Sequence, residues 1–138
     1  MKTFLTLSVI AVLLLGGAVW FSRTIQTNDT GIISTNGLHW HPELEIYVNG
    51  EKQEVPQNIG LTGVHQPMHT HDDLPIIHLE FQGVVKKDDV ILGQFFKNWG
   101  KDMSSFGANM KMTVNGIENT ELENYVMQDK DKIVLHYE

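Results

Sequence analysis

Histidine is the residue type through which this sequence could do chemistry, because imidazole nitrogens are good ligands for zinc, copper, iron and nickel. Six of the seven histidines fall between positions 39 and 78, namely His39, His41, His65, His69, His71 and His78. The chain has no cysteine, so thiolate metal sites, thiolate nucleophiles and disulfides are excluded. The density of histidine therefore predicts a metal site built from imidazole and carboxylate groups.

The spacing within the cluster supports this interpretation, because residues two apart on a β-strand point to the same face. Three such pairs occur, namely His39 with His41, His69 with His71, and His78 with Glu80. Pairs that project from the strands of one small sheet would converge on one metal ion or on two. With His65, four residues before His69, the predicted metal ligands are His39, His41, His65, His69, His71, His78 and Glu80.

Several neighbouring residues allow variants of this site. Asp72 and Asp73 directly follow His71 and could bind the metal or orient an imidazole, although a plain turn is the favoured interpretation for Asp73. His136 stands apart and is interpreted as structural. Three methionines, Met68, Met110 and Met112, would point to copper(I) if their thioethers were ligands, but core packing is the favoured interpretation.

The amino-terminal region predicts export of the domain. Residues 4–21 are eighteen residues without a charge. As a helix they would be about 27 Å long, close to the ~30 Å hydrocarbon core of a bilayer. Residues 1–23 are predicted to be a membrane anchor, and a cleaved signal peptide is the alternative. The expected location is the cell membrane, with a single pass and the carboxyl-terminal domain extracytoplasmic.

The charge of the exported part limits its partners. Beyond residue 23 the chain has 8 lysines against 17 acidic residues, a net charge of −9. This charge argues against binding nucleic acid or docking on an anionic membrane surface, and it suits a protein that collects cations. The expected partners are a metal ion and, through the amino-terminal helix, the membrane. Protein partners are unknown.

The elements that must position the histidines begin after a predicted linker at residues 24–37, and the domain spans residues 38–138. Leu44, Ile46 and Val48 alternate with polar neighbours, which predicts a half-buried strand, and Asn49-Gly50 predicts a hairpin turn after it. If this strand extends back to Leu38, His39 and His41 lie opposite its apolar face.

The rest of the domain is strand-rich with one helix. Strands are expected at residues 76–81, 109–114 and 132–137, and Asn115-Gly116 predicts a second turn. A helix is expected over residues 90–99, with Asp88 or Asp89 as its cap and Gly100 as its end. The fold class is therefore α+β, with a small antiparallel or mixed sheet and one helix. The element order resembles the β-grasp arrangement of ubiquitin-like folds.

Five segments carry a resemblance to a group of proteins: HWHPELEIYVNG (39–50), PQNIG (56–60), HTHDD (69–73), IHLE (77–80) and LGQFFKNWG (92–100). On these motifs the chain resembles an uncharacterised group of membrane-anchored extracytoplasmic His-rich domains. That resemblance implies a domain built around the histidine pairs and supplies no reaction. Residues 63–71 also resemble the opening of the cupin motif, but the glutamate and second motif of cupins have no counterpart here.

Three functions remain open from the sequence. The first is a membrane-anchored module that binds, handles or senses a transition metal, copper or zinc. The second is a metal-dependent enzyme with a His/carboxylate site, against which stands the lack of a G-x-S-x-G, phosphate-loop or H-E-x-x-H motif. The third is an interaction domain whose histidine surface responds to pH.

Overall fold

The computed structural model describes Gly16 and residues 31–138, and its fold class is α+β, as predicted. The described part contains one α-helix, α2 (Leu92–Trp99), and three 3-10 helices, η1 (Lys87–Val90), η2 (Met103–Phe106) and η3 (Leu122–Asn124). The strands are β1 (Ile32–Ser34), β2 (Leu38–Trp40), β3 (Glu43–Val48), β4 (Glu51–Gln53), β5 (Met68–His69), β6 (His78–Phe81), β7 (Val85–Lys86), β8 (Met110–Val114), β9 (Ile117–Asn119) and β10 (Lys132–Tyr137).

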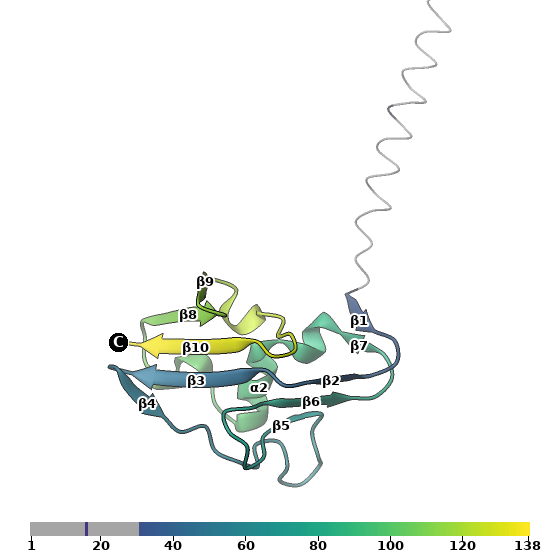
Figure 1. The fold of residues 1–138 in the computed structure, drawn as a ribbon, viewed down its shortest axis with the longest axis horizontal. Helices are drawn as coiled ribbons and strands as arrows, with labels where there is room; N and C mark the ends of the chain where they lie inside the picture. The colour runs from purple at the N-terminus through teal and green to yellow at the C-terminus, as the bar shows by residue number, and fades with distance from the viewer. Residues whose placement is uncertain (1–15, 17–30) are drawn as a thin grey trace, which may run out of the picture. The chain divides into compact units, whose positions relative to one another are not determined.

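The largest sheet is mixed, with the strand order β4-β3-β10-β8-β9 (Figure 1). Its two central strands, β3 and β10, run parallel, and the outer pairings are antiparallel. Both predicted hairpin turns are confirmed, because Asn49-Gly50 and Asn115-Gly116 adopt the positive φ angles that such tight turns require. The order fits the predicted β-grasp arrangement.

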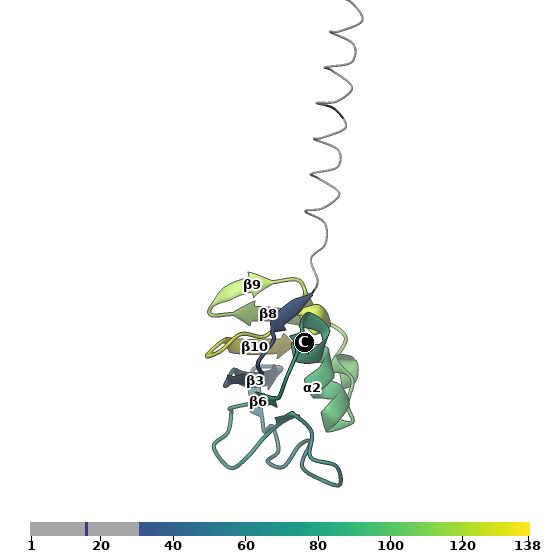
Figure 2. The same cartoon turned by 90° about the vertical axis from the view of Figure 1, so that its right-hand side faces the viewer.

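The core lies between this sheet and α2, which covers one face of it (Figure 2). Alternate residues of the central strands point inward and are buried, as the period-2 pattern predicts. They include Leu44, Ile46, Ile133, Leu135 and Tyr137. From the helix, Leu92, Phe95 and Phe96 complete the core. No histidine belongs to this hydrophobic core in the described part of the chain, although Met68 and Leu79, the neighbours of His69 and His78, do.

The helix begins later than its sequence pattern predicts. Ile91 is extended and pairs with Val126, so the α-helix starts at Leu92 after the separate 3-10 turn η1. Asp89 caps that 3-10 turn by accepting the Lys86 N–H at 2.8 Å, and the prediction that it caps the α-helix is wrong. Gly100 ends the helix in the left-handed conformation, as predicted.

A second sheet, with the order β2-β6-β5, carries three of the histidines, His39, His69 and His78. The sequence predicted that one strand could run from Leu38 through Val48, but the chain breaks at His41-Pro42, so β2 and β3 belong to different sheets. Pro42 has no N–H to offer a strand partner, and its carbonyl accepts the Ile77 N–H at 2.8 Å.

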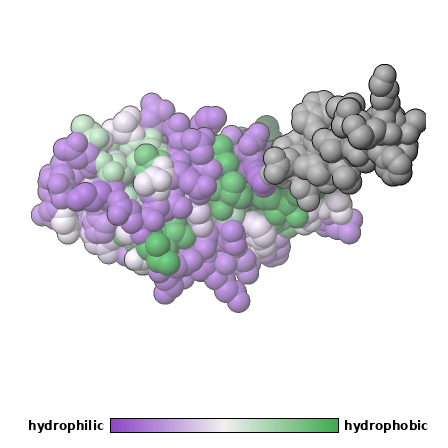
Figure 3. All heavy atoms as spheres, turned by 90° about the horizontal axis from the view of Figure 1, so that it is seen from above, coloured by the Kyte–Doolittle hydropathy of each residue, from purple (hydrophilic) through white to green (hydrophobic). Residues whose placement is uncertain are grey.

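Strand β1 falls within residues 32–34 of the predicted linker at 24–37, and it pairs with β7 of the domain. The anchor predicted for residues 1–23 lies outside the described residues, apart from Gly16. Within the described part, we find no helix with the length and apolarity that a membrane crossing needs. The face in Figure 3 is mainly hydrophilic, with hydrophobic side chains in separate patches.

Candidate metal centre

One face of the β2-β6-β5 sheet brings four of the predicted ligands together. His39 on β2 lies directly opposite Glu80 on β6, and His69 on β5 lies directly opposite His78 on β6. Because His78 and Glu80 are two apart on one strand, all four side chains share a face. The opposite face is apolar, since the cross-strand neighbours Leu79 and Met68 are buried.

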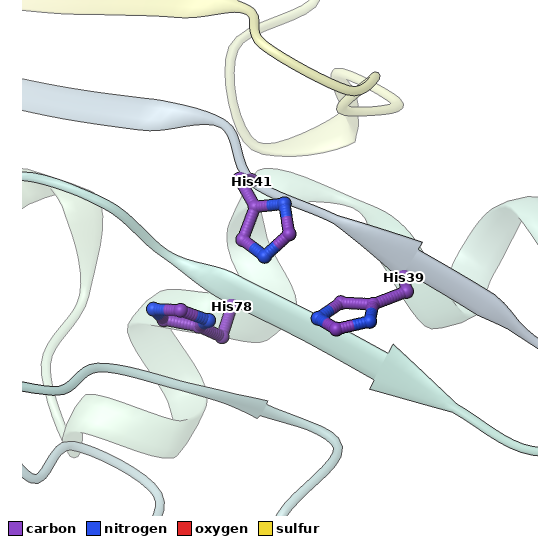
Figure 4. A group of neighbouring side chains, drawn as sticks. All are labelled: His39, His41 and His78. Atoms are coloured by element: carbon purple, nitrogen blue, oxygen red, sulfur yellow. The ribbon is translucent and has the colours of Figure 1, made fainter.

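His41 joins this face from just beyond the end of β2. A nitrogen from each of His39, His41 and His78 lies within 4.8 Å of the other two, so the three residues could hold a metal ion. Figure 4 shows the three rings with nitrogens facing a common space. Ligand nitrogens in a tetrahedral zinc site are about 3.3 Å apart, given Zn–N bonds of ~2.0–2.1 Å. Small side-chain rotations would therefore bring these nitrogens within bonding distance of one ion. We call His39, His41 and His78 the trio.

A carboxylate lies beside each of these imidazoles. Glu80 Oε1 is 3.4 Å from His39 Nε2 and 3.9 Å from His78 Nδ1. The first distance is close to the separation of two ligands on one ion, so Glu80 is placed to supply a fourth ligand. Both carboxylate oxygens of Asp73 lie within 3.1 Å of His78 Nε2. This contact holds the pKa of the Asp73 carboxyl below its usual value.

Asp73 therefore leaves Nδ1 as the nitrogen of His78 that faces the trio. A metal-bound histidine usually donates its other ring N–H to a carboxylate or carbonyl, which fixes the tautomer and raises the basicity of the ligand. The interpretation of Asp73 as part of a plain turn was incomplete. The residue does lie in the turn before β6, and it also orients an imidazole.

Asp129 contacts His41 much as Asp73 contacts His78. Its Oδ1 accepts the His41 backbone N–H at 2.9 Å and lies 3.8 Å from His41 Nδ1. The turn that carries Asp129 is fixed by the buried Asp131, whose Oδ2 accepts the Tyr125 hydroxyl at 2.7 Å and the Gln128 N–H at 2.8 Å. Asp129 is not among the residues predicted from the sequence, because nothing local to this turn indicates a neighbour 88 residues away.

The other three predicted histidines adjoin the trio. The ring centroids of His65 and His69 are 4.8 Å apart, as are those of His69 and His71, and the His71 ring lies 4.9 Å from that of His78. The six imidazoles thus form one continuous chain of ring contacts. His136 lies elsewhere and stacks on Tyr47, with their centroids 5.1 Å apart.

His69 differs from the rest because it is buried, with 1% of its surface exposed. Its Nδ1 lies 3.0 Å from the Gln66 carbonyl oxygen. Since a carbonyl can only accept, Nδ1 carries the hydrogen and Nε2 carries the lone pair. Burial lowers the pKa of His69, so the ring stays neutral at neutral pH.

Methionine takes no part in this arrangement. Met68 and Met112 are buried in the hydrophobic core, and Met110 packs against it. The predicted packing role is confirmed, and the donor set around the trio is nitrogen and oxygen only.

Comparison of the chain with known protein families, curated proteins and solved structures finds no match. The function proposed below therefore rests on the geometry of the histidines and their carboxylate neighbours.

Proposed function

We propose that this protein is a membrane-anchored, extracytoplasmic domain that binds a transition metal, copper or zinc, at His39, His41 and His78. The observation that carries the proposal is the convergence of three imidazole nitrogens within 4.8 Å of one another. Glu80 is the proposed fourth ligand, because its Oε1 lies beside nitrogens of two of the three histidines. The resemblance to anchored His-rich domains is in keeping with this proposal.

The carboxylates around the trio support metal binding over a pH-sensitive surface. Asp73 and Asp129 approach His78 and His41 from their own sides, as expected for groups that orient metal ligands. The nitrogen and oxygen donors suit zinc(II) or copper(II), whereas copper(I) would favour thioethers. The high proportion of acidic residues would raise the local concentration of cations.

The position of the trio supports exchange of the metal with the surroundings. The side chains of His39 and His41 are 64% and 37% exposed, whereas that of His78 is 12% exposed. A site with two accessible ligands can be loaded and emptied at the surface. The hydrophobic core lies on the opposite face of the small sheet, where Met68 and Leu79 are buried without an ion, so the ion is not needed to complete the fold. We therefore favour binding, delivery or sensing over a purely structural metal.

The test is metal content measured on the full chain, purified without a polyhistidine tag, which would itself bind metal. After loading with Zn²⁺ or Cu²⁺ and removal of the excess, we expect stoichiometric metal. His39→Ala, at an exposed residue, and His41→Ala, at a half-buried one, should each abolish binding at the trio. His136→Ala is the matched control, because that histidine is also exposed and lies outside the cluster.

The outcomes are distinct. A wild-type chain that retains no stoichiometric zinc or copper would rule out the proposal. Equal metal loss in His41→Ala and His136→Ala would show that binding is non-specific. With binding established, spectroscopy of a Co²⁺-loaded sample distinguishes a fourth protein ligand from a coordinated water, and only the latter leaves a position open for catalysis.

A further inference from the structure

The buried face of the histidine cluster has an acceptor without a donor. His69 Nε2 is the buried side-chain nitrogen or oxygen that has no hydrogen-bond partner in the described part of the chain. Buried polar atoms are nearly always paired, and an exception in a folded protein calls for an explanation. The neighbours of His69 are other imidazoles, so this atom lies where metal ligands are concentrated.

We infer that the cluster contains a second, inner metal position with His69 Nε2 as its central ligand and His65 and His71 as co-ligands. The inference rests on the proposed function and extends it from one ion to two. The ligand would be a transition ion that prefers nitrogen, such as Zn²⁺ or Cu²⁺.

The hydrogen bonding of His69 prepares its Nε2 for this role. The Gln66 carbonyl accepts the Nδ1–H, which leaves the Nε2 lone pair unprotonated and fixes the orientation of the ring. Metal-bound histidines characteristically have this arrangement, with the second nitrogen donating to a backbone carbonyl or carboxylate. The tautomer that suits metal binding is therefore present before any ion arrives.

The ring separations of the co-ligands suit a shared ion, although their nitrogens do not converge as those of His39, His41 and His78 do and would have to turn toward it. Two imidazoles on one metal have ring centroids about 4.5–5.2 Å apart for bond angles between square and tetrahedral, given metal–nitrogen bonds of ~2.0–2.1 Å. His65 and His71 each lie 4.8 Å from His69 by this measure. His65 is exposed and His71 is half-buried, so both can rotate to bring a nitrogen toward Nε2.

His78 separates the two positions. Its ring lies 5.0 Å from that of His41 in the outer trio and 4.9 Å from that of His71 in the inner set. Because Asp73 occupies its Nε2, His78 has one nitrogen left, and that nitrogen faces the outer trio. The inner position must then depend on the other three histidines, which makes the two sites separable by mutation.

The experiment is a zinc titration of the full, untagged chain, with bound zinc counted by elemental analysis. We expect two equivalents in the wild type, one in His69→Asn, and one in the double variant His39→Ala/His41→Ala. Asparagine at position 69 can still donate to the Gln66 carbonyl but has no group in place of Nε2. His136→Asn should keep both equivalents.

A second variant guards against misfolding of His69→Asn, because His69 is buried. The double variant His65→Ala/His71→Ala removes the two co-ligands, which lie nearer the surface than His69. It should also lose one equivalent of zinc. Circular dichroism and thermal unfolding of each variant establish that it is folded.

Two results would overturn the inference. If the wild type binds one zinc ion, which His39→Ala abolishes and His69→Asn leaves unaffected, the inner position does not exist and the proposed function stands. If the wild type binds none, both the inference and the proposed function fail.

Discussion

Asp129 holds His41 at two points, accepting its backbone N–H at 2.9 Å while lying 3.8 Å from Nδ1 of its ring. One carboxylate thus constrains both the main chain and the imidazole. The turn that carries this carboxylate leads directly into β10, the central strand of the large sheet. The geometry of a residue at the end of β2 is therefore set from the far end of the sequence.

Asp129→Asn is expected to weaken metal binding about 10- to 100-fold, the usual effect of losing a group that orients a metal ligand. The fold should change little, because the asparagine Oδ1 can still accept the His41 N–H. Isothermal titration with Zn²⁺ measures the affinity. Glu118→Gln removes one negative charge from an exposed site on β9 and is the control. Equal weakening in both variants would show a general charge effect and contradict the prediction.

Metal should stabilise a fold that already exists without it. At a free Zn²⁺ concentration 100 times Kd, a single site adds about 2.7 kcal/mol to the free energy of unfolding. For a domain of this size that raises Tm by about 10 °C. Differential scanning calorimetry with zinc and then with a chelator measures the change. His41→Ala should show a clearly smaller shift. Unfolding of the wild type by the chelator alone would mean that the metal is structural, against our expectation.

The metal-free protein should lose stability as the pH falls through about 6.5, in part because of His69. Burial lowers the pKa of His69 in the folded state, so below about pH 6.5 the unfolded chain binds the proton more readily. The stability that the neutral His69 contributes is thus fully present above the pKa of the unfolded state. It is lost as the pH falls toward the pKa of the folded state. His69→Asn should flatten the dependence of Tm on pH between 7 and 5, measured in chelator, with His136→Asn as the control. An unchanged slope would rule out this role of His69.

Two glycines in the loop before β5 provide a matched pair. Gly60 and Gly63 both have positive φ, +73° and +85°, but a Cβ at Gly60 would lie 2.6 Å from the Met68 carbonyl oxygen, whereas a Cβ at Gly63 meets nothing within 4 Å. Gly63→Ala should therefore cost about 1–2 kcal/mol from the left-handed backbone alone. Gly60→Ala should cost a further ~1–3 kcal/mol from overpacking.

Urea unfolding measures both variants. Gly60→Ala should also weaken binding at the inner position, because Met68 directly precedes His69. Equal destabilisation by the two substitutions would show that the close approach of Gly60 to the Met68 carbonyl is unimportant.

Local patterns in the sequence predicted the features of the fold that depend on near neighbours. The alternation of Leu44, Ile46 and Val48 gives a strand because one face must meet the core, and Asn49-Gly50 reverses the chain because both residues tolerate positive φ. The pairing of His78 with Glu80 on one face follows from strand geometry alone. These predictions needed no knowledge of distant segments.

The features that were missed depend on contacts between distant segments. The break at Pro42 places β2 and β3 in different sheets, which alternation cannot reveal. The contact of Asp129 with His41 has no local signal, and the burial of His69 results from its place on β5 beside β6. Six histidines in one stretch indicated a cluster, but which three converge depends on how the strands are paired.

The break at Pro42 has a mechanical consequence. At this point the chain passes from the small sheet to the large one, and hydrogen bonds brace it on both sides, from the Ile77 N–H to the Pro42 carbonyl and from the Glu43 N–H to the Asp131 carbonyl. An ion bound at His41 would lie beside this joint, with its ligands on the small sheet and with Asp129, in the turn before β10, holding His41 from the other side. Loading at the surface would then stiffen the joint, and amide hydrogen exchange at Glu43 and Leu44 would slow, although neither residue touches the ion.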